Sequence, residues 1–337
     1  MKKLRLLMVL GCVCFLFTAL TLPATVCAKE VVLKWSAFLP KSHPETKSLQ
    51  ARFFDKVNER AKGKLSIKWA GGPEVFSPRD LGIATSKGIV DISLCTVPFY
   101  QEVVPGVGAA KLIKLSPMQE REYGIYDYMN EHHEKHGMWY IGRPNPTKAT
   151  FFYLYLNKKV TKPEDFKGLR IGAAGSGRPM AQGLGASVVI LKLSEYYTAM
   201  ERNLVDGINC VPLQAWVAWG CHEVTKYVID HPYYQSTGMV IANLKSWNKM
   251  SKELQDLVMQ TMVEYEKMQY PIEVKITAGA RQKMVDKGVE FYKLSPEVAK
   301  WYLDTTYDAS WKYEENRFGA FVTGLKERVF KAYETAK

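Results

Sequence analysis

Short apolar runs along the first hundred residues predict strands separated by helices. Residues 31–36 and the alternating residues 65–69 each predict a strand. Between them, apolar residues recur at helical spacing and predict an amphipathic helix that Gly63 ends. A helical stretch over 78–88 leads to a further predicted strand over 89–94. This order is typical of a doubly wound lobe, in which helices cover a sheet.

The same order returns between residues 161 and 212. A short buried strand over 169–171 leads into the small-residue loop 172–177. Arg178 and Pro179 then begin a helix, because proline is tolerated in the first helical turn. Two more apolar runs, with a helix between them, complete the segment. Strands joined by helices must cross over, so the pattern predicts a second, mostly parallel sheet covered by helices.

The remaining pattern predicts how the two lobes are connected. Residues 151–156 predict a strand that crosses between lobes, and residues 236–242 predict a returning strand. Ser251 is placed to cap a long helix, which Pro271 is expected to kink or break. The tail over 301–330 is helical and aromatic.

The N-terminus has the pattern of a secretory signal. Three basic residues precede an apolar run over 6–20 and small residues over 26–28. The run is shorter than the roughly 20 residues of a membrane span. We therefore predict cleavage after Ala28, with an uncleaved anchor as the alternative. The predicted domains are a signal peptide (1–28), a first lobe (29–150) to which part of the C-terminal region returns, a second lobe (151–245), and a spanning helix with a C-terminal helical region (246–337).

Charge and cysteine content narrow the function only slightly. The net charge is +12, but the basic residues are scattered among acids without a basic stripe, so we expect no nucleic-acid partner. Such a surface favours anionic solutes weakly. Three cysteines, Cys95, Cys210 and Cys221, lie outside the signal. Cys210 and Cys221 are the nearest candidates for a disulfide, and buried free thiols are the alternative.

No group of residues predicts catalysis or a cofactor. His132 and His136 are four apart on a predicted helix, which a zinc site could use, but no further ligands follow, and a solvated helix end fits better. The loop 172–177 lacks the Gly-Lys-Ser/Thr of a phosphate loop, and no Gly-x-Ser-x-Gly elbow occurs. We expect no enzyme, no metal and no cofactor.

The order PEDFKGLRI, GA, SEYYTAM and DG over residues 163–207 resembles the C-terminal half of the DctP family. These proteins are the extracytoplasmic solute receptors of tripartite ATP-independent periplasmic (TRAP) transporters. The G-x-V-D-I strand at 88–92 is similar to the family's N-terminal half. The resemblance implies two doubly wound α/β lobes of periplasmic-binding-protein type, joined by crossing strands and a long helix. It also implies a periplasmic location and a membrane permease with a small and a large subunit as partner.

A ligand between two such lobes lies at the carboxyl ends of the strands. The residues just after each predicted strand, together with an aromatic residue that follows, are therefore the predicted solute contacts. They are Phe38, Thr96, Phe99, Phe152, Tyr153, Gly172, Ser176, Arg178, Cys210 and Trp216.

The sequence departs from the family where an organic acid would be held. The family's carboxylate-binding arginine falls on Gly172, and Arg170, two residues earlier, should face the other side of the strand. The family's asparagine after DG falls on Cys210. A second basic or polar position falls on Phe152, and the aromatic before SE is Leu193.

Three accounts of the solute remain open. In the first, the solute is less polar, and the aromatic contacts, with Trp216, enclose it. In the second, an anion is bound by backbone N–H groups of the loop 172–177, assisted by Ser176 and Arg178. In the third, Arg170 is the clamp. Two other functions also remain open: a sensor subunit that reports ligand to a membrane kinase, and a secreted enzyme on the same scaffold.

Overall fold

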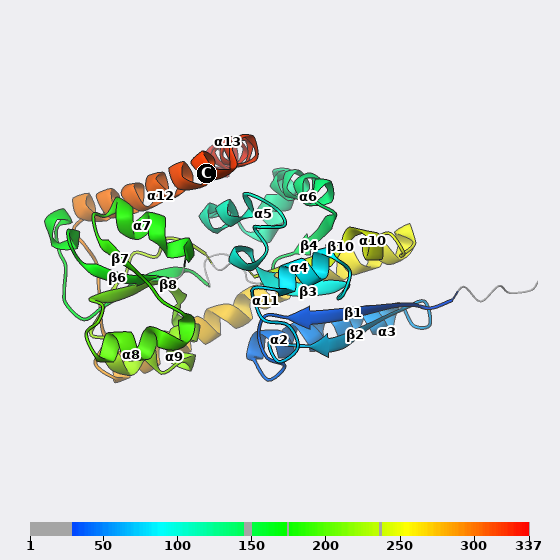
Figure 1. Ribbon diagram of the computed structural model, residues 1–337, viewed down its shortest axis with the longest axis horizontal. Coiled ribbons are helices and arrows are strands. Elements are labelled where there is room, and N and C mark those ends of the chain that lie inside the picture. The colour runs from blue at the N-terminus through cyan, green and yellow to red at the C-terminus, as the bar shows by residue number, and fades with distance from the viewer. Residues whose placement is uncertain (1–28, 145–149, 174, 236–237, 337) are drawn as a thin grey trace, which may run out of the picture. The chain divides into compact units, whose positions relative to one another are not determined.

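The computed structural model describes residues 29–144, 150–173, 175–235 and 238–336, and residues 31–337 form one compact unit. Two β-sheets with packed helices build this unit (Figure 1). The predicted α/β class with two lobes is confirmed. Among these described residues, no helix is both long and apolar enough to cross a lipid bilayer.

The first sheet has the strand order β2-β1-β3-β10-β4. Its strands are β1 (Val31–Ala37), β2 (Leu65–Gly71), β3 (Ile92–Thr96), β4 (Met138–Gly142) and β10 (Gly238–Asn243). β1 is parallel to β2 and β3, whereas β10 runs antiparallel between β3 and β4. The predicted second lobe, which ends at residue 245, therefore includes a strand that completes the first sheet.

The predicted amphipathic helix after β1 is confirmed. It consists of α2 (Pro44–Leu49), a wider π-helical turn (Gln50–Phe54) and α3 (Asp55–Arg60). Phe53, Phe54 and the other apolar positions of its inner face are fully buried, and the Phe54 ring lies 4.2 Å from the ring of Trp35 in β1. Large aromatic contacts of this kind hold the helix on the sheet. The other helices of this lobe are α4 (Leu81–Ser86), α5 (Pro117–Glu122), α6 (Ile125–Lys135) and α10 (Leu244–Trp247).

The second sheet has the strand order β11-β9-β5-β8-β6-β7. Its strands are β5 (Phe152–Leu156), β6 (Arg170–Ala173), β7 (Ser187–Ile190), β8 (Gly207–Pro212), β9 (Tyr227–Ile229) and β11 (Glu290–Tyr292). β6 is parallel to β7 and β8, as predicted, and β5 is antiparallel to β8 and β9. β5 pairs only within this sheet among the described residues, and residues 145–149 before it lie outside them. The helices of this lobe are α7 (Arg178–Gly183), α8 (Tyr196–Glu201) and α9 (Leu213–Ala218).

A 35-residue helix, α11 (Lys252–Asp286), contacts both lobes (Figure 1). Ser251 caps it, as predicted, by accepting a hydrogen bond from the N–H of Leu254. The helix packs on α3 and β4 of the first lobe and on α9 of the second. It continues through Pro271, so this proline does not break it. Packing on both sides of the proline compensates for the missing backbone hydrogen bond.

The predicted aromatic helical tail is confirmed as two helices, α12 (Pro296–Phe318) and α13 (Ala320–Thr335). α12 packs on α7 and also on the 3₁₀ helix η3 (Val107–Leu112), which follows β3. α13 packs on α6. α12 therefore joins the second lobe to the first, above α7 in Figure 1.

Gly172 lies inside β6, where it pairs with Val189 of β7 and Ile208 of β8. A Cβ atom at this position would lie 2.4 Å from Cδ1 of Ile208 and 2.8 Å from Cδ1 of Leu191. A side chain at position 172 would therefore point into packed apolar side chains, which leave no space for a residue larger than glycine.

The predicted solvated helix end at the histidines of α6 is only partly confirmed, because one of these histidines is buried. His133 is fully buried, and its Nδ1–H donates to the carbonyl oxygen of Met129 at 2.6 Å. Its Nε2 lies 3.2 Å from Oη of Tyr100. Burial lowers the pKa of His133 to about 4, although the hydrogen bond to Met129 opposes this shift. No group of three or more His, Cys, Asp or Glu that could hold a metal lies in the part of the chain that the structure describes.

The packing at Gly172 predicts that Gly172→Ala destabilises the protein. We expect the free energy of unfolding to fall by about 1–3 kcal/mol, because the added methyl overpacks the core. Urea unfolding followed by circular dichroism measures the change. The matched control is Gly279→Ala in α11, where an added Cβ has no atom within 4 Å and should leave stability unchanged or raise it by about 1 kcal/mol. Equal stability of Gly172→Ala and the native protein would contradict the packing.

The burial of His133 predicts a loss of stability in mild acid. Its pKa is lowered in the folded state, so below about pH 6.5 the unfolded chain binds one proton more. The free energy of unfolding should therefore fall as the pH decreases from about 6.5 to 4, by up to about 1.4 kcal/mol per pH unit from this group. Urea unfolding at several pH values should give a smaller slope for His133→Gln. Equal pH slopes for the native protein and the variant would contradict this prediction, because they would mean that His133 takes up a proton as readily in the folded state as in the unfolded state.

Candidate functional site

A cavity of about 250 Å³ lies where three segments of the fold meet. They are the chain that leaves β3 and forms η3, the start of α7, and the second half of α12. The first segment belongs to the first lobe and the second to the second lobe. The lining residues are Val97, Pro98, Gln101, Gly108, Lys111, Ser176, Arg178, Tyr313, Glu314 and Arg317.

A buried ion pair between Lys111 of η3 and Glu314 of α12 forms one wall of the cavity. Each side chain is 3% exposed, and Nζ of Lys111 donates to Oε1 of Glu314. The Lys111 ammonium also lies 5.6 Å from the centroid of the Tyr234 ring. A buried charge is tolerated only when it is paired, so the two residues fix η3 and α12 against each other.

Two arginines at the cavity have no carboxylate partner among the described residues. Arg178, the first residue of α7, is exposed, and no Asp or Glu oxygen in the described chain lies within 4.0 Å of its guanidinium nitrogens. Arg317 donates to Oη of Tyr313 at 2.9 Å and lies over the rings of Tyr313 and Phe318. With the Lys111–Glu314 pair neutral, the cavity carries two unbalanced positive charges. Such a site attracts anions.

Ser176 and Arg178 are the sequence-predicted contacts that line this cavity. Thr96 and Phe99 flank Val97 and Pro98 in the chain, and these two residues do line it. Phe38, which directly follows β1, lies with its ring centroid 6.1 Å from that of Phe99. The carboxyl ends of β1 and β3 therefore bring three of the predicted residues to the edge of the first sheet.

Phe152 and Tyr153 lie on opposite faces of β5. Phe152 packs against the apolar core that also contains Leu154, whereas Tyr153 packs against the core that contains Tyr155. Burial raises the pKa of the Tyr153 hydroxyl, and the nearby Asp230 carboxylate raises it further. The two neighbours therefore cannot share one wall of a pocket.

Cys210 lies in β8 with a backbone φ of +61°, a strained value for a residue with a side chain. Its N–H donates to Oη of Tyr233 at 3.0 Å. Burial raises the pKa of the Cys210 thiol to about 12, so the thiol is neutral at physiological pH. Cys95, Cys210 and Cys221 are all free thiols, so the structure agrees with the alternative of free thiols and not with a Cys210–Cys221 disulfide.

Trp216 and Arg170 lie away from the cavity. Trp216 is fully buried in the core of the second lobe, where its ring stacks on Tyr155 at 4.1 Å and its N–H donates to Oγ1 of Thr225. Arg170 is the first residue of β6, and its guanidinium group donates two hydrogen bonds, of 3.2 and 3.1 Å, to the carboxylate of Asp206. It therefore lies at the amino end of the strand, opposite the loop that follows β6.

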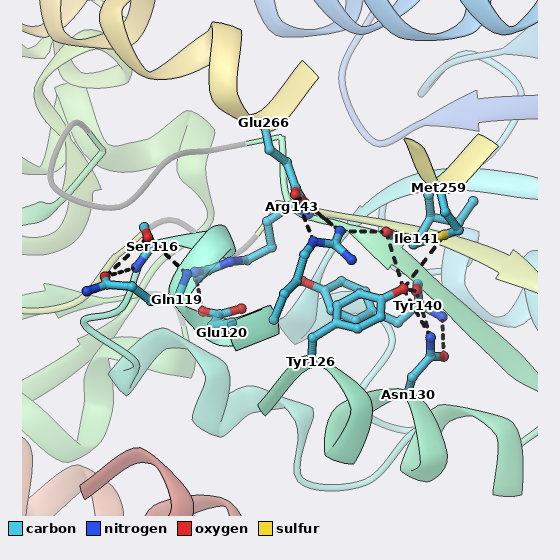
Figure 2. A network of polar contacts seen from close by, with 11 residues as sticks. Ser116, Gln119, Glu120, Tyr126, Asn130, Tyr140, Ile141, Arg143, Met259 and Glu266 are labelled. Carbon is cyan, nitrogen blue, oxygen red and sulfur yellow. Dashed lines mark hydrogen bonds and ion pairs between the residues drawn. The ribbon is translucent and has the colours of Figure 1, made fainter. Parts of the chain in front are cut away.

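A second group of charged residues is buried behind the end of β4 (Figure 2). Arg143 is 1% exposed and donates to Glu120 and to the carbonyl oxygen of Leu115. Its backbone N–H donates to Glu266 of α11, which also accepts from Arg121. Burial raises the pKa of Glu120 to about 7, against the opposing charge of Arg143. The network ties β4, α5 and α11 together where the chain leaves the first sheet.

The sequence pattern did not reveal Lys111, Glu314, Arg317 or this network. Lys111 and Glu314 are separated by 203 positions, and each reads locally as an ordinary polar residue of a helix. Only the aromatic content of the tail indicated that α12 packs against other elements.

The sequence matches DctP, described as bacterial extracellular solute-binding protein, family 7, over residues 35–313. An uncharacterized protein of Haemophilus influenzae is 29% identical over 268 residues, which are 77% of this chain and 80% of that protein. A TRAP periplasmic solute binding protein from Desulfovibrio salexigens, with bound orotic acid, has a similar structure with a TM-score of 0.78 and 18% identity. The similarity covers 91% of this chain and 99% of that one.

Another TRAP periplasmic solute binding protein, from Haemophilus influenzae with bound L-gulonate, has a similar structure with a TM-score of 0.71 and 22% identity. The similarity covers 90% of this chain and 99% of that chain. Identities this low show a shared fold. The family match itself extends from β1 into α12. The chain therefore belongs to the DctP family of bacterial extracellular solute-binding proteins.

Proposed function

We propose that this protein is the periplasmic receptor of a TRAP transporter and binds a small organic acid in the cavity between η3, α7 and α12. The observation that carries the proposal is the charge of the cavity, where Arg178 and Arg317 have no carboxylate partner among the described residues. The planar guanidinium group of arginine is well suited to bind a carboxylate.

Two similar proteins support a carboxylate as the ligand. Orotic acid and L-gulonate, bound by the receptors from Desulfovibrio salexigens and Haemophilus influenzae, share one carboxylate and differ in the rest of the molecule. A receptor of this fold can therefore keep the acid group as its common feature. For this chain we propose the same class of solute.

Of the three accounts of the solute, we therefore propose the second, an anion bound near the loop 172–177, but with side chains in place of backbone N–H groups as the main contacts. α7 has only six residues, so the side chains of Ser176 and Arg178 contribute more than its backbone N–H groups. Arg170 is already paired with Asp206. We propose that Phe38, Thr96 and Phe99 form the apolar rim of the site.

We propose that solute binding closes the lobes. The cavity is lined by Lys111 from the first lobe and by Ser176 and Arg178 from the second, so a bound solute would contact both. A ligand with higher affinity for the closed form shifts the population toward it. The closed receptor would then present a changed surface to the two permease subunits.

A thermal-shift screen of the purified protein tests the solute class. The screen compares aliphatic and aromatic carboxylates with uncharged aromatics of similar size. A ligand at one hundred times its dissociation constant should stabilise the fold by about 2.7 kcal/mol. We expect shifts with carboxylates alone. Equal shifts with uncharged aromatics would favour the aromatic pocket instead.

The two arginines predict a specific loss of affinity. Arg178→Met and Arg317→Met should each weaken binding of a carboxylate that shifts the native protein, by about tenfold or more, because a charge-assisted hydrogen bond is lost. Isothermal titration calorimetry measures the dissociation constants.

Arg170→Met is the matched control for this test, because it removes the same charge at the other end of β6. It should bind as the native protein does. Unchanged affinity in both cavity variants, or an equal loss in the control, would contradict the proposed site.

A further inference from the structure

One oxygen of Glu314 is buried without a partner. Oε1 accepts from Lys111, but Oε2 has no hydrogen-bond partner among the described residues. A buried acceptor left unpaired loses its hydration without compensation, and the loss is larger when the group carries charge. This cost is removed when a bound molecule brings a donor to Oε2.

The backbone of Gly108 lies close to this oxygen. A Cβ atom on Gly108 would lie 3.2 Å from Oε2 of Glu314 and 2.9 Å from Oε1 of Gln101. All three residues line the cavity. A methyl group at position 108 would therefore press against both oxygens, so only a residue without a side chain lets Gln101 and Glu314 keep these positions at the cavity.

We infer that Glu314 accepts a hydrogen bond from a hydroxyl group of the solute, so that the receptor selects hydroxy acids over their deoxy analogues. This inference rests on the proposed function, since it assumes that the solute occupies this cavity. It goes beyond the family match, which ends at residue 313, before Glu314 and Arg317.

The positions of Glu314 and Arg317 indicate where the hydroxyl lies in the solute. The two residues are three apart in α12, so their side chains are neighbours on one face, with about 5–6 Å between Cβ atoms. A carboxylate bound by Arg317 would therefore place a hydroxyl on a nearby carbon within reach of Glu314. We expect a 2-hydroxy or 3-hydroxy acid.

The charge of the cavity favours a hydroxyl over an ammonium group as the donor. Lys111 already neutralises Glu314, and Arg178 and Arg317 add two further positive charges. A solute ammonium at this place would meet like charges, which repel it. A neutral donor satisfies Oε2 without that cost.

Calorimetric titration with two matched series tests the inference. The first series is L-malate, succinate and L-aspartate, and the second is L-lactate, propionate and L-alanine. In at least one series the hydroxy acid should bind about tenfold or more tightly than the deoxy acid, as expected for a hydrogen bond to a charged group. The amino acid should bind no better than the deoxy acid.

Variants of the pair then test the role of Glu314. Lys111→Met/Glu314→Leu removes both buried charges together, a change that folds tolerate better than the loss of one partner. The preference for the hydroxy acid should fall below about twofold. The control Lys326→Met/Glu315→Leu makes the same change at a neighbouring pair between α13 and α12 that does not line the cavity, and should keep the preference. Gly108→Ala, which places a methyl group 3.2 Å from Oε2, should also reduce this preference and serves if the double variant does not fold.

The outcomes separate this inference from the proposed function. If carboxylates bind and hydroxy and deoxy acids bind equally, the role of Glu314 is wrong and the receptor function stands. A preference that persists in the folded Lys111→Met/Glu314→Leu variant also overturns the role of Glu314. If no carboxylate in either series or in the thermal-shift screen binds, the proposed function fails, and the inference fails with it.

Discussion

The candidate site depends on the buried ion pair between Lys111 and Glu314. Each partner is 3% exposed, so neither charge is well solvated, and each requires the other. Because Lys111 belongs to η3 and Glu314 to α12, the pair holds a helix of the C-terminal tail against the first lobe. The same helix packs on α7 of the second lobe. The packing of α12 on α7 thus sets Arg178 and Arg317 relative to each other, and the ion pair sets both relative to η3 of the first lobe.

The sequence predicted those parts of the fold that local periodicity determines. The helix with buried Phe53 and Phe54, the parallel strands around β6 and the cap at Ser251 follow from residues near one another in the chain. Ser176 and Arg178 were predicted for the same reason, because a loop between a strand and a helix lies at the carboxyl edge of the sheet. The contact between Lys111 and Glu314 could not be predicted in this way. It depends on how the long segment between them folds, and no local pattern in the sequence indicates it.

Two predicted contacts show where local sequence patterns stop indicating the direction of a side chain. Trp216 has helical spacing, but spacing alone does not tell whether an aromatic ring faces a cleft or the core behind the sheet, and here it faces the core. Cys210 has a positive φ, and the pairing of β5 with β8 shifts register between Tyr153 and Tyr155. A side-chain direction read from simple alternation does not hold across such an irregularity.

The packing around Gly172 also limits how this receptor can evolve. The resemblance to the family places an arginine at this position, but Ile208 and Leu191 fill the space that its side chain would need. To place an arginine here, a lineage would first have to shorten these apolar residues, and each shortening would leave a cavity that costs about 1 kcal/mol or more. Those intermediates would be less stable and would bind no solute better. Selection acting on single substitutions would therefore alter solute preference at the cavity lining sooner than it would place an arginine in β6.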